Sequence, residues 1–247
     1  MQSSDVYLFA GRNLLEESLK SGHLKSVYFS SSFKNLLPAR LAKIVHLLEK
    51  KHISISFEDK RFFDSFEKKY NTTTEGVIFK TSVPRISLDE VMSSEDNSDS
   101  LICFVDDLTF SANMGSILRS ASAFGVKALV ISSSSKLTLN QEVARYSMGG
   151  IFYVPVIHES TYAFLDKAKR NGYNIIGFDI NQTLLYNTDS YTSKDVLFFG
   201  GESKGISPNV RNKMNRVLAI PMSNTVQSLN VSVTVGIILS YRYSINV

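Results

Sequence analysis

The sequence predicts an α/β protein in which a mainly parallel sheet is covered by helices on both faces. Short apolar segments typical of strands alternate along the chain with longer segments of helical periodicity. Polar segments that contain glycine follow several of these strands, which is where parallel sheets bind their ligands. An acidic segment with few large apolar residues divides the chain into two such blocks.

The first block predicts a small α/β unit. One of its helices has leucine and isoleucine at helical spacing between residues 37 and 48, and it tolerates Pro38 in its first turn. In the segment ISISFED, Ile53, Ile55 and Phe57 alternate with polar residues, as expected of a half-buried strand. In chain order we expect a helix at 12–22 that ends at Gly22, a strand at 26–31, a helix at 36–52, a strand at 53–59, a helix with Phe63 and Phe66, and a strand near 75–83.

The second block repeats the alternation and opens with the apolar strand LICFV. Its last segment, VSVTVGIILSYRYS, has the β-branched residues of a strand, but its length and the shared face of Leu229, Val233 and Gly236 favour a helix. Three polar segments, DDLTFSANMG, GGESKGIS and PMSNTVQSLN, follow predicted strands and are expected to meet at one site. The strands are predicted at 101–105, 127–132, 174–179, 196–200 and 216–220.

The charge distribution supports a division into residues 1–85, 86–100 and 101–247. The first block carries 14 Lys and Arg against 9 Asp and Glu, and the last carries 13 against 9. The segment between them has five acids and no base, and we interpret it as a mobile linker or a loosely held connector. Two basic blocks suit a polyanionic partner such as nucleic acid. An ordinary basic protein with solvated lysines has the same charge balance, so charge alone leaves both interpretations open.

Composition disfavours several classes of site. Cys103 is the single cysteine, so no internal disulfide can form, and its place in LICFV predicts a small buried core residue. The four histidines lack the spacing of a metal site, so no metal is expected. The first residues do not resemble a secretory leader, and no apolar run reaches the about 20 residues of a membrane helix. We therefore expect a cytoplasmic protein.

The segment GGESKGIS fits three interpretations. It matches the G-x-S-x-G turn of serine hydrolases, but no Asp, Glu or His follows it to activate Ser203. It also resembles a phosphate-binding loop, but Ile206 stands where that loop needs lysine. The third interpretation, a backbone cradle for another ligand, is therefore favoured.

Together the three polar segments resemble the signature motifs of the SpoU/TrmH branch of the SPOUT RNA methyltransferases. The motifs are DDLTFSANMGSILRSASAFGV, FFGGESKGIS and IPMSNTVQSLNVSVTVGIIL, and they follow the family's order over about residues 101–243. The segment SMGG followed by YVPV also resembles the family. The sequence departs from the common pattern at Phe110-Ser111-Ala112-Asn113, where many members have Asp-Pro-x-Asn, and at Thr74-Glu75-Gly76, where many have His-Gln-Gly.

The resemblance implies a fold and an activity. Residues 101–247 would form a SPOUT methyltransferase domain with a trefoil knot, preceded by an L30e-like RNA substrate-binding domain at 1–85 and an acidic linker at 86–100. The protein would be a homodimer that binds S-adenosylmethionine in the knot and methylates a ribose 2′-hydroxyl in RNA, with rRNA favoured over tRNA. The alternative is an RNA-binding or ribosome-assembly protein that keeps the knotted fold without catalysis.

The resemblance also implies the residues of the site. Arg119 would act at the hydroxyl; because a guanidinium stays protonated, it would stabilise the developing alkoxide rather than serve as a base. Asn113 and Ser228 also suit plain helix capping, which needs no ligand. The implied catalytic residues are Asn113, Arg119, Glu202, Ser228 and Asn230, and the implied cofactor-binding residues are Gly200, Gly201, Gly205, Ile220, Met222, Ser228 and Leu229.

Overall fold

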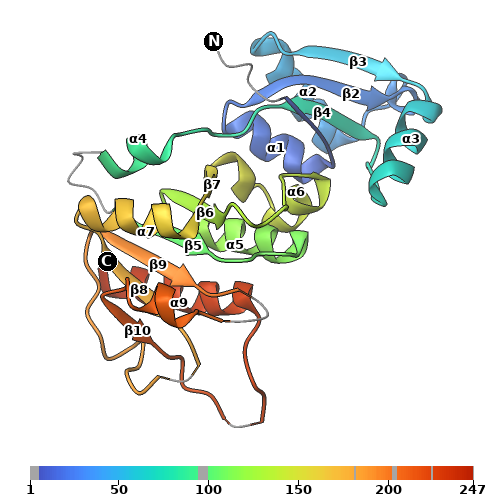
Figure 1. Cartoon of the computed structure of the whole chain (residues 1–247). Helices are drawn as coiled ribbons and strands as arrows, with labels where there is room; N and C mark the ends of the chain where they lie inside the picture. The colour runs from blue at the N-terminus through green and yellow to red at the C-terminus, as the bar shows by residue number, and fades with distance from the viewer. Residues whose placement is uncertain (1–5, 94–99, 181, 202–204, 224, 247) are drawn as a thin grey trace.

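The residues that the structure describes form two sheets that stand side by side, each with helices packed on it (Figure 1). The computed structural model describes residues 6–93, 100–180, 182–201, 205–223 and 225–246. The sheet of the C-terminal unit is parallel throughout its described strand pairs, which confirms the predicted α/β class with a parallel sheet.

The described part of the N-terminal unit comprises β1 (Tyr7–Ala10), α1 (Arg12–Lys20), β2 (Leu24–Ser30), η1 (Ser31–Phe33), α2 (Ala39–Lys50), β3 (Ser54–Glu58), α3 (Lys60–Tyr70) and β4 (Val77–Thr81). The strands lie in the order β1-β4-β2-β3, with β4 antiparallel to both of its neighbours and β2 parallel to β3. Alternate residues of each strand point to opposite faces. Helices α1 and α2 pack on one face, and α3 packs on the other through Phe63 and Phe66.

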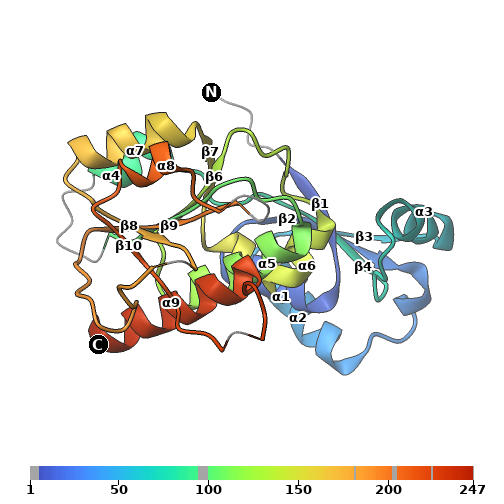
Figure 2. The same ribbon diagram turned by 60° about the horizontal axis from the view of Figure 1, so that its bottom comes forward.

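The described part of the C-terminal unit comprises β5 (Ile102–Val105), α5 (Ser111–Ala123), β6 (Ala128–Ser132), α6 (Gln141–Ser147), η2 (Gly150–Phe152), β7 (Val156–Glu159), α7 (Thr161–Arg170), β8 (Asn174–Phe178), β9 (Asp195–Phe199), α8 (Pro208–Arg211), β10 (Arg216–Leu218) and α9 (Val231–Asn246). The strand order is β10-β8-β9-β5-β6-β7. Helices α7 and α8 pack on one face and α5, α6 and α9 on the other, as Figure 2 shows. The strands β5, β6 and β9 are buried throughout, because both faces of the sheet are covered.

The expectation of a loose connector at 86–100 is wrong for its first half. Residues Leu88–Ser93 form a short helix, α4, whose Leu88, Val91 and Met92 are buried. These three side chains join the same core cluster as Phe164 of α7, so α4 packs on the C-terminal sheet. Residues 94–99 lie outside the described residues.

The two units share one hydrophobic core and a specific polar contact. The side chain of Gln141 is 3% exposed and completes the edge of β1, because it accepts a hydrogen bond from Ala10 N (2.9 Å) and donates one to Ala10 O (3.2 Å). The ring of Phe152 lies 6.3 Å from that of Phe9 and 6.5 Å from that of Phe79. Such buried contacts hold the units in a defined relative position.

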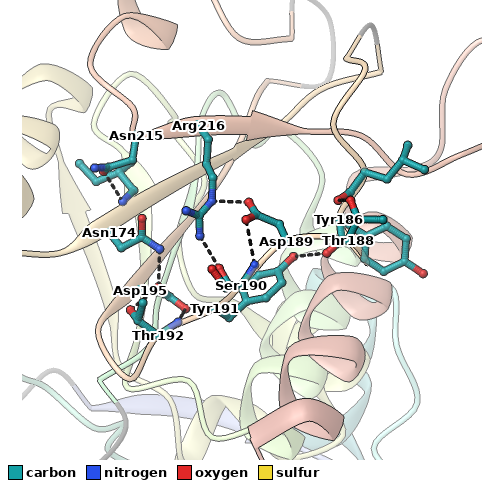
Figure 3. A network of polar contacts seen from close by, with 12 residues as sticks. Asn174, Tyr186, Thr188, Asp189, Ser190, Tyr191, Thr192, Asp195, Asn215 and Arg216 are labelled. Carbon is teal, nitrogen blue, oxygen red and sulfur yellow. Dashed lines mark hydrogen bonds and ion pairs between the residues drawn. The ribbon is translucent and has the colours of Figure 1, made fainter.

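A buried ion pair closes the edge of the C-terminal sheet at which its strands begin, which we call the amino edge. Asp195 and Arg242 are 0% and 1% exposed, and Arg242 Nε donates to Asp195 Oδ2 at 3.0 Å. Asn174 and Thr192 also donate to the Asp195 carboxylate, at 2.7–2.9 Å. Figure 3 shows the Asp195 carboxylate between Asn174 and Thr192. It also shows Arg216 in contact with Asp189 and Ser190 of the loop before β9. The network ties α9 to β9 and to the loop before it.

Several local predictions are confirmed and others are corrected. The C-terminal segment is a helix as predicted, and Cys103 is fully buried, which raises the pKa of its thiol to about 12. Pro38 immediately precedes α2 instead of lying in its first turn. Strands β1 and β7 were not predicted. No helix of the described residues is long and apolar enough to cross a membrane.

Candidate active site

A cavity of about 750 Å³ opens where β8, β9 and β10 end, at what we call the carboxyl edge of the C-terminal sheet. The three polar segments that were predicted to meet at one site all contribute to it. The lining residues are Asn113, Phe178, Asp179, Ile180, Phe199, Gly200, Gly201, Gly205, Ile206, Arg211, Ile220, Met222, Gln227, Ser228, Leu229, Asn230, Val231 and Thr234.

The floor of the cavity consists of backbone after β9, where Gly200 and Gly201 lie close to Gly205. Gly205 N donates to Gly201 O at 3.1 Å, and Gly205 has a φ of +61°, which favours glycine. A Cβ atom on Gly200 would lie 2.5 Å from the carbonyl carbon of Gly205. A side chain at residue 200 would therefore push the two segments apart. This supports the interpretation of GGESKGIS as a backbone cradle.

The start of α9 is joined to α5 by two asparagines. Asn230 Nδ2 donates to Asn113 Oδ1 at 3.0 Å. Asn230 Oδ1 accepts from Ser232 N at 2.8 Å, so Asn230 caps α9. The capping role suggested for Ser228 is therefore wrong, and Ser228 is an exposed residue of the cavity wall. The capping role suggested for Asn113 is also wrong, because α5 begins at Ser111.

Arg119 is the predicted catalytic residue that the structure keeps away from the cavity. It lies on α5 six residues after Asn113, with an exposed side chain, and it is absent from the described residues that line the cavity. Six residues of helix span about 9 Å and direct the two side chains to different faces. Asn113, Ser228 and Asn230 are thus brought together, and Arg119 is not. Glu202 lies outside the described residues.

The predicted cofactor-binding residues all lie in the cavity wall. Gly200, Gly201 and Gly205 form its floor, and Ile220, Met222, Ser228 and Leu229 come from the two segments that precede α9. Their roles in holding a cofactor stay predictions. Among the described residues, no group of three His, Cys, Asp or Glu side chains could hold a metal ion.

Sequence reasoning missed two charged residues of the cavity, Asp179 and Arg211. Asp179 follows β8, and Arg211 is the last residue of α8; the two side chains form an ion pair between Arg211 Nη2 and Asp179 Oδ2. They lie 32 residues apart in the chain. Asp179 ends a predicted strand and could have been noticed, but nothing near Arg211 in the sequence marks it as its partner.

A parallel α/β sheet with a glycine-lined cavity at its carboxyl edge defines a class of ligand-binding α/β proteins. The SpoU rRNA methylase family matches residues 100–240, which is more than half of the chain. The chain therefore belongs to this family.

Individual proteins resemble the chain over nearly its whole length. YacO of Bacillus subtilis (strain 168), which is named as a TrmH family tRNA/rRNA methyltransferase, is 26% identical over 237 residues, covering 94% of this chain and 93% of YacO. The SpoU methyltransferase AviRb of Streptomyces viridochromogenes, solved in complex with AdoMet, superposes with a TM-score of 0.80 at 19% identity, covering 98% and 90% of the two chains. A solved RNA 2′-O ribose methyltransferase superposes with a TM-score of 0.77 at 21% identity, covering 98% and 89%. These superpositions show a common fold.

Proposed function

We propose that the protein is an S-adenosylmethionine-dependent methyltransferase that modifies a ribose 2′-hydroxyl in RNA, with rRNA favoured over tRNA. The observation that carries the proposal is the cavity, where the glycine cradle, Ser228 and the Asn113–Asn230 pair meet. Family membership supports the activity, and similar proteins named as tRNA/rRNA or ribose 2′-O methyltransferases support the substrate class.

The cavity suits S-adenosylmethionine in size and lining. Its volume of about 750 Å³ lies within the usual range for small-molecule sites, roughly 300–1,000 Å³. A Cβ atom on Gly205 would meet nothing nearer than the Asp179 carboxylate at 4.0 Å, so the backbone at Gly205 is accessible to a flat group such as adenine. When bound, this cofactor supplies an electrophilic methyl group carried on a sulfonium. We propose that Gly200, Ile220 and Leu229 hold it through backbone groups.

The protein side chains would position the acceptor and stabilise its charge. The Asn113–Asn230 hydrogen bond joins two amides of the cavity wall, and either would contact the acceptor ribose. Arg119 would place positive charge beside the oxygen as the hydroxyl loses its proton. Glu202 would fix the neighbouring loop or pair with Arg119. Precise placement of such groups contributes strongly to rates.

The position of Arg119 favours a homodimer in which each chain completes the other's site. Helix α9 is rich in apolar residues, and its Val233, Tyr243 and Ile245 are each nearly half exposed. Phe110, just before α5, is 62% exposed. Exposed apolar side chains on a helix and just before the neighbouring helix are typical of a surface that a second subunit covers. In such a dimer, Arg119 of the partner subunit would reach the cavity.

The contacts of one residue of α9 support the knotted fold that we propose for the C-terminal unit. Tyr241 of α9 donates to Asn187 O at 2.8 Å and packs against Tyr186 and Tyr191, so α9 contacts the segment before β9, and this contact supports the proposed trefoil knot. We propose residues 1–85 as the L30e-like RNA-binding domain, 101–247 as the methyltransferase domain, and the connecting residues 86–100 as an acidic segment. A cytoplasmic location stays a prediction from the sequence.

The proposal is tested by transfer of labelled methyl groups from S-adenosylmethionine to rRNA and tRNA fractions that lack 2′-O-methyl groups, followed by nucleoside analysis. We expect a 2′-O-methylated nucleoside from the rRNA fraction. A labelled base would overturn the ribose assignment. Binding of RNA and cofactor without transfer to either fraction would favour the alternative, an RNA-binding or ribosome-assembly protein without catalysis.

A further inference from the structure

The ion pair between Asp179 and Arg211 stands at the cavity wall formed by the end of β8 and by α8. The side chain of Asp179 is 15% exposed and that of Arg211 is 36% exposed. Among the described residues of the wall, these two are the charged side chains; the others are glycine, apolar residues, amides and hydroxyls. In the described part of the cavity, charged groups of a ligand would therefore be recognised by this pair.

Fold stability does not explain why the pair is placed here. A partly exposed ion pair contributes little to stability, because water and salt screen the attraction. Replacing both residues with neutral ones would cost the fold little. A pair of opposite charges in the wall of a ligand cavity is instead suited to a ligand that carries both charges.

Both groups keep hydrogen-bonding capacity for a ligand. Asp179 accepts from Ile180 N at 2.7 Å and from one nitrogen of Arg211. A carboxylate offers about four acceptor positions and a guanidinium five donors, so these contacts use about half of the acceptor positions and one of the donors. A Cβ atom on Gly205 would lie 4.0 Å from each Asp179 carboxylate oxygen, so the carboxylate faces the glycine cradle with no side chain between them.

We propose that Arg211 and Asp179 bind the amino-acid end of S-adenosylmethionine, with Arg211 contacting its α-carboxylate and Asp179 its α-ammonium group. The inference rests on the proposed function and names a subsite within it. An α-amino acid carries a negative and a positive group on one carbon, which matches a guanidinium and a carboxylate held side by side. The Asn113–Asn230 pair is then left for the acceptor ribose.

Two ligands that share the adenosine half isolate this contact. S-Adenosylhomocysteine has the amino-acid end, and 5′-methylthioadenosine lacks it. Titration calorimetry of both ligands is performed on the wild-type protein, on Arg211→Met and on Asp179→Asn. Lys213→Met is the matched control, because Lys213 pairs with Asp166 outside the cavity wall and lies two residues from Arg211. Thermal unfolding without ligand shows whether each variant is folded.

We expect Arg211→Met and Asp179→Asn each to weaken S-adenosylhomocysteine binding by about 10- to 100-fold, the usual range for a charged hydrogen bond. Binding of 5′-methylthioadenosine should stay within about twofold, and Lys213→Met should change neither ligand. Equal losses for both ligands would overturn the inference by assigning the pair to the adenosine half, such as its ribose hydroxyls. No loss for either ligand would overturn it as well.

Two further outcomes keep the test decisive. If a variant unfolds, the wild-type comparison still applies: S-adenosylhomocysteine should bind at least about 10-fold more tightly than 5′-methylthioadenosine, and equal affinities would contradict the subsite. If the wild-type protein binds neither ligand, the proposed function itself fails. That result differs from a failure of the subsite, in which both ligands bind and the variants do not discriminate between them.

Discussion

The two edges of the C-terminal sheet each carry an arginine–aspartate pair, but the pairs differ in burial and surroundings. At the amino edge, Arg242 and Asp195 are sealed from water and hydrogen-bonded to Asn174 and Thr192. At the carboxyl edge, Arg211 and Asp179 are partly exposed and face the cavity. The same residue types thus hold the fold at one edge and are available to a ligand at the other.

Arg242→Met tests the amino edge and should have the largest effect on stability. Removing one partner leaves the Asp195 carboxylate buried without its counter-charge, which costs about 3–5 kcal/mol. Urea unfolding measures the loss. Arg211→Met at the carboxyl edge is the control and should cost under about 1 kcal/mol. Similar losses of unfolding free energy for both variants would contradict the account that the pair at the amino edge stabilises the fold and the pair at the carboxyl edge does not.

Arg119→Ala should reduce methylation without affecting the fold. Loss of a positive charge beside a developing alkoxide costs about 100- to 1,000-fold in rate, and an exposed residue changes the free energy of unfolding by under about 0.5 kcal/mol. Initial rates and S-adenosylhomocysteine affinity are measured together, and affinity should be unchanged. Methylation at the wild-type rate would exclude Arg119 from the mechanism.

Mixing Arg119→Ala with Gly200→Ala, at a cofactor concentration too low to occupy the Gly200→Ala cavity, tests whether Arg119 acts across a dimer. In heterodimers of Arg119→Ala and Gly200→Ala, one cavity has an intact cradle and receives Arg119 of the partner subunit. Random exchange should therefore restore about a quarter of wild-type activity. Native mass spectrometry, which distinguishes the heterodimer from the two homodimers by mass, confirms that subunits have exchanged. If exchange occurs and no activity returns, Arg119 acts within its own chain.

Gly200→Ala should weaken cofactor binding by about 10-fold or more, because the added Cβ meets Gly205 at 2.5 Å and opens the cradle. Gly236→Ala in α9 is the control: its Cβ would lie 3.6 Å from Ser120 Oγ of α5, which is an ordinary contact between the two helices. Calorimetry with S-adenosylhomocysteine measures both variants. Unchanged affinity in Gly200→Ala would mean that the ligand does not use the cradle.

Asn230→Ala should cost about 1 kcal/mol of unfolding free energy, since it removes the cap of α9. It also removes the contact with Asn113, so methylation should fall by more than this stability loss predicts. Ser232→Ala keeps the capping oxygen and serves as the control. Equal effects of the two substitutions on methylation would contradict a role for the asparagine pair.

The smallest effect is expected at Cys103. Burial holds its thiol pKa at about 12, so the native protein should not react with a thiol reagent at neutral pH. Reaction should appear only on unfolding, and urea provides the positive control. Rapid labelling of the native protein would show that β5 is more accessible than the structure indicates.

The sequence predicted most strands of the C-terminal sheet because their apolar runs are buried on both faces. It missed β1 and β7, which are four residues each and carry little pattern. It also missed α4, because acidic neighbours mask the helical spacing of Leu88, Val91 and Met92. In these segments tertiary packing, rather than local composition, decides the structure.

The candidate site was predictable where a motif carries it and not where tertiary contacts create it. The three polar segments identified the cavity because parallel strands end at one edge. The capping roles of Asn113 and Ser228 were wrong, because α5 begins at Ser111 and α9 begins at Val231. Neither start follows directly after the residue that the sequence pattern suggested as the cap. The pairing of Arg242 with Asp195 joins residues 47 apart, and no local rule relates them.

Hydrogen exchange with and without S-adenosylhomocysteine tests most directly that the carboxyl edge is the functional one. We predict that the ligand slows exchange at residues 178–180, 199–201 and 227–231, which border the cavity. Residues 192–195 at the amino edge should not change, because their network is already closed. Protection at the amino edge, or none at the carboxyl edge despite saturating ligand, would contradict the account.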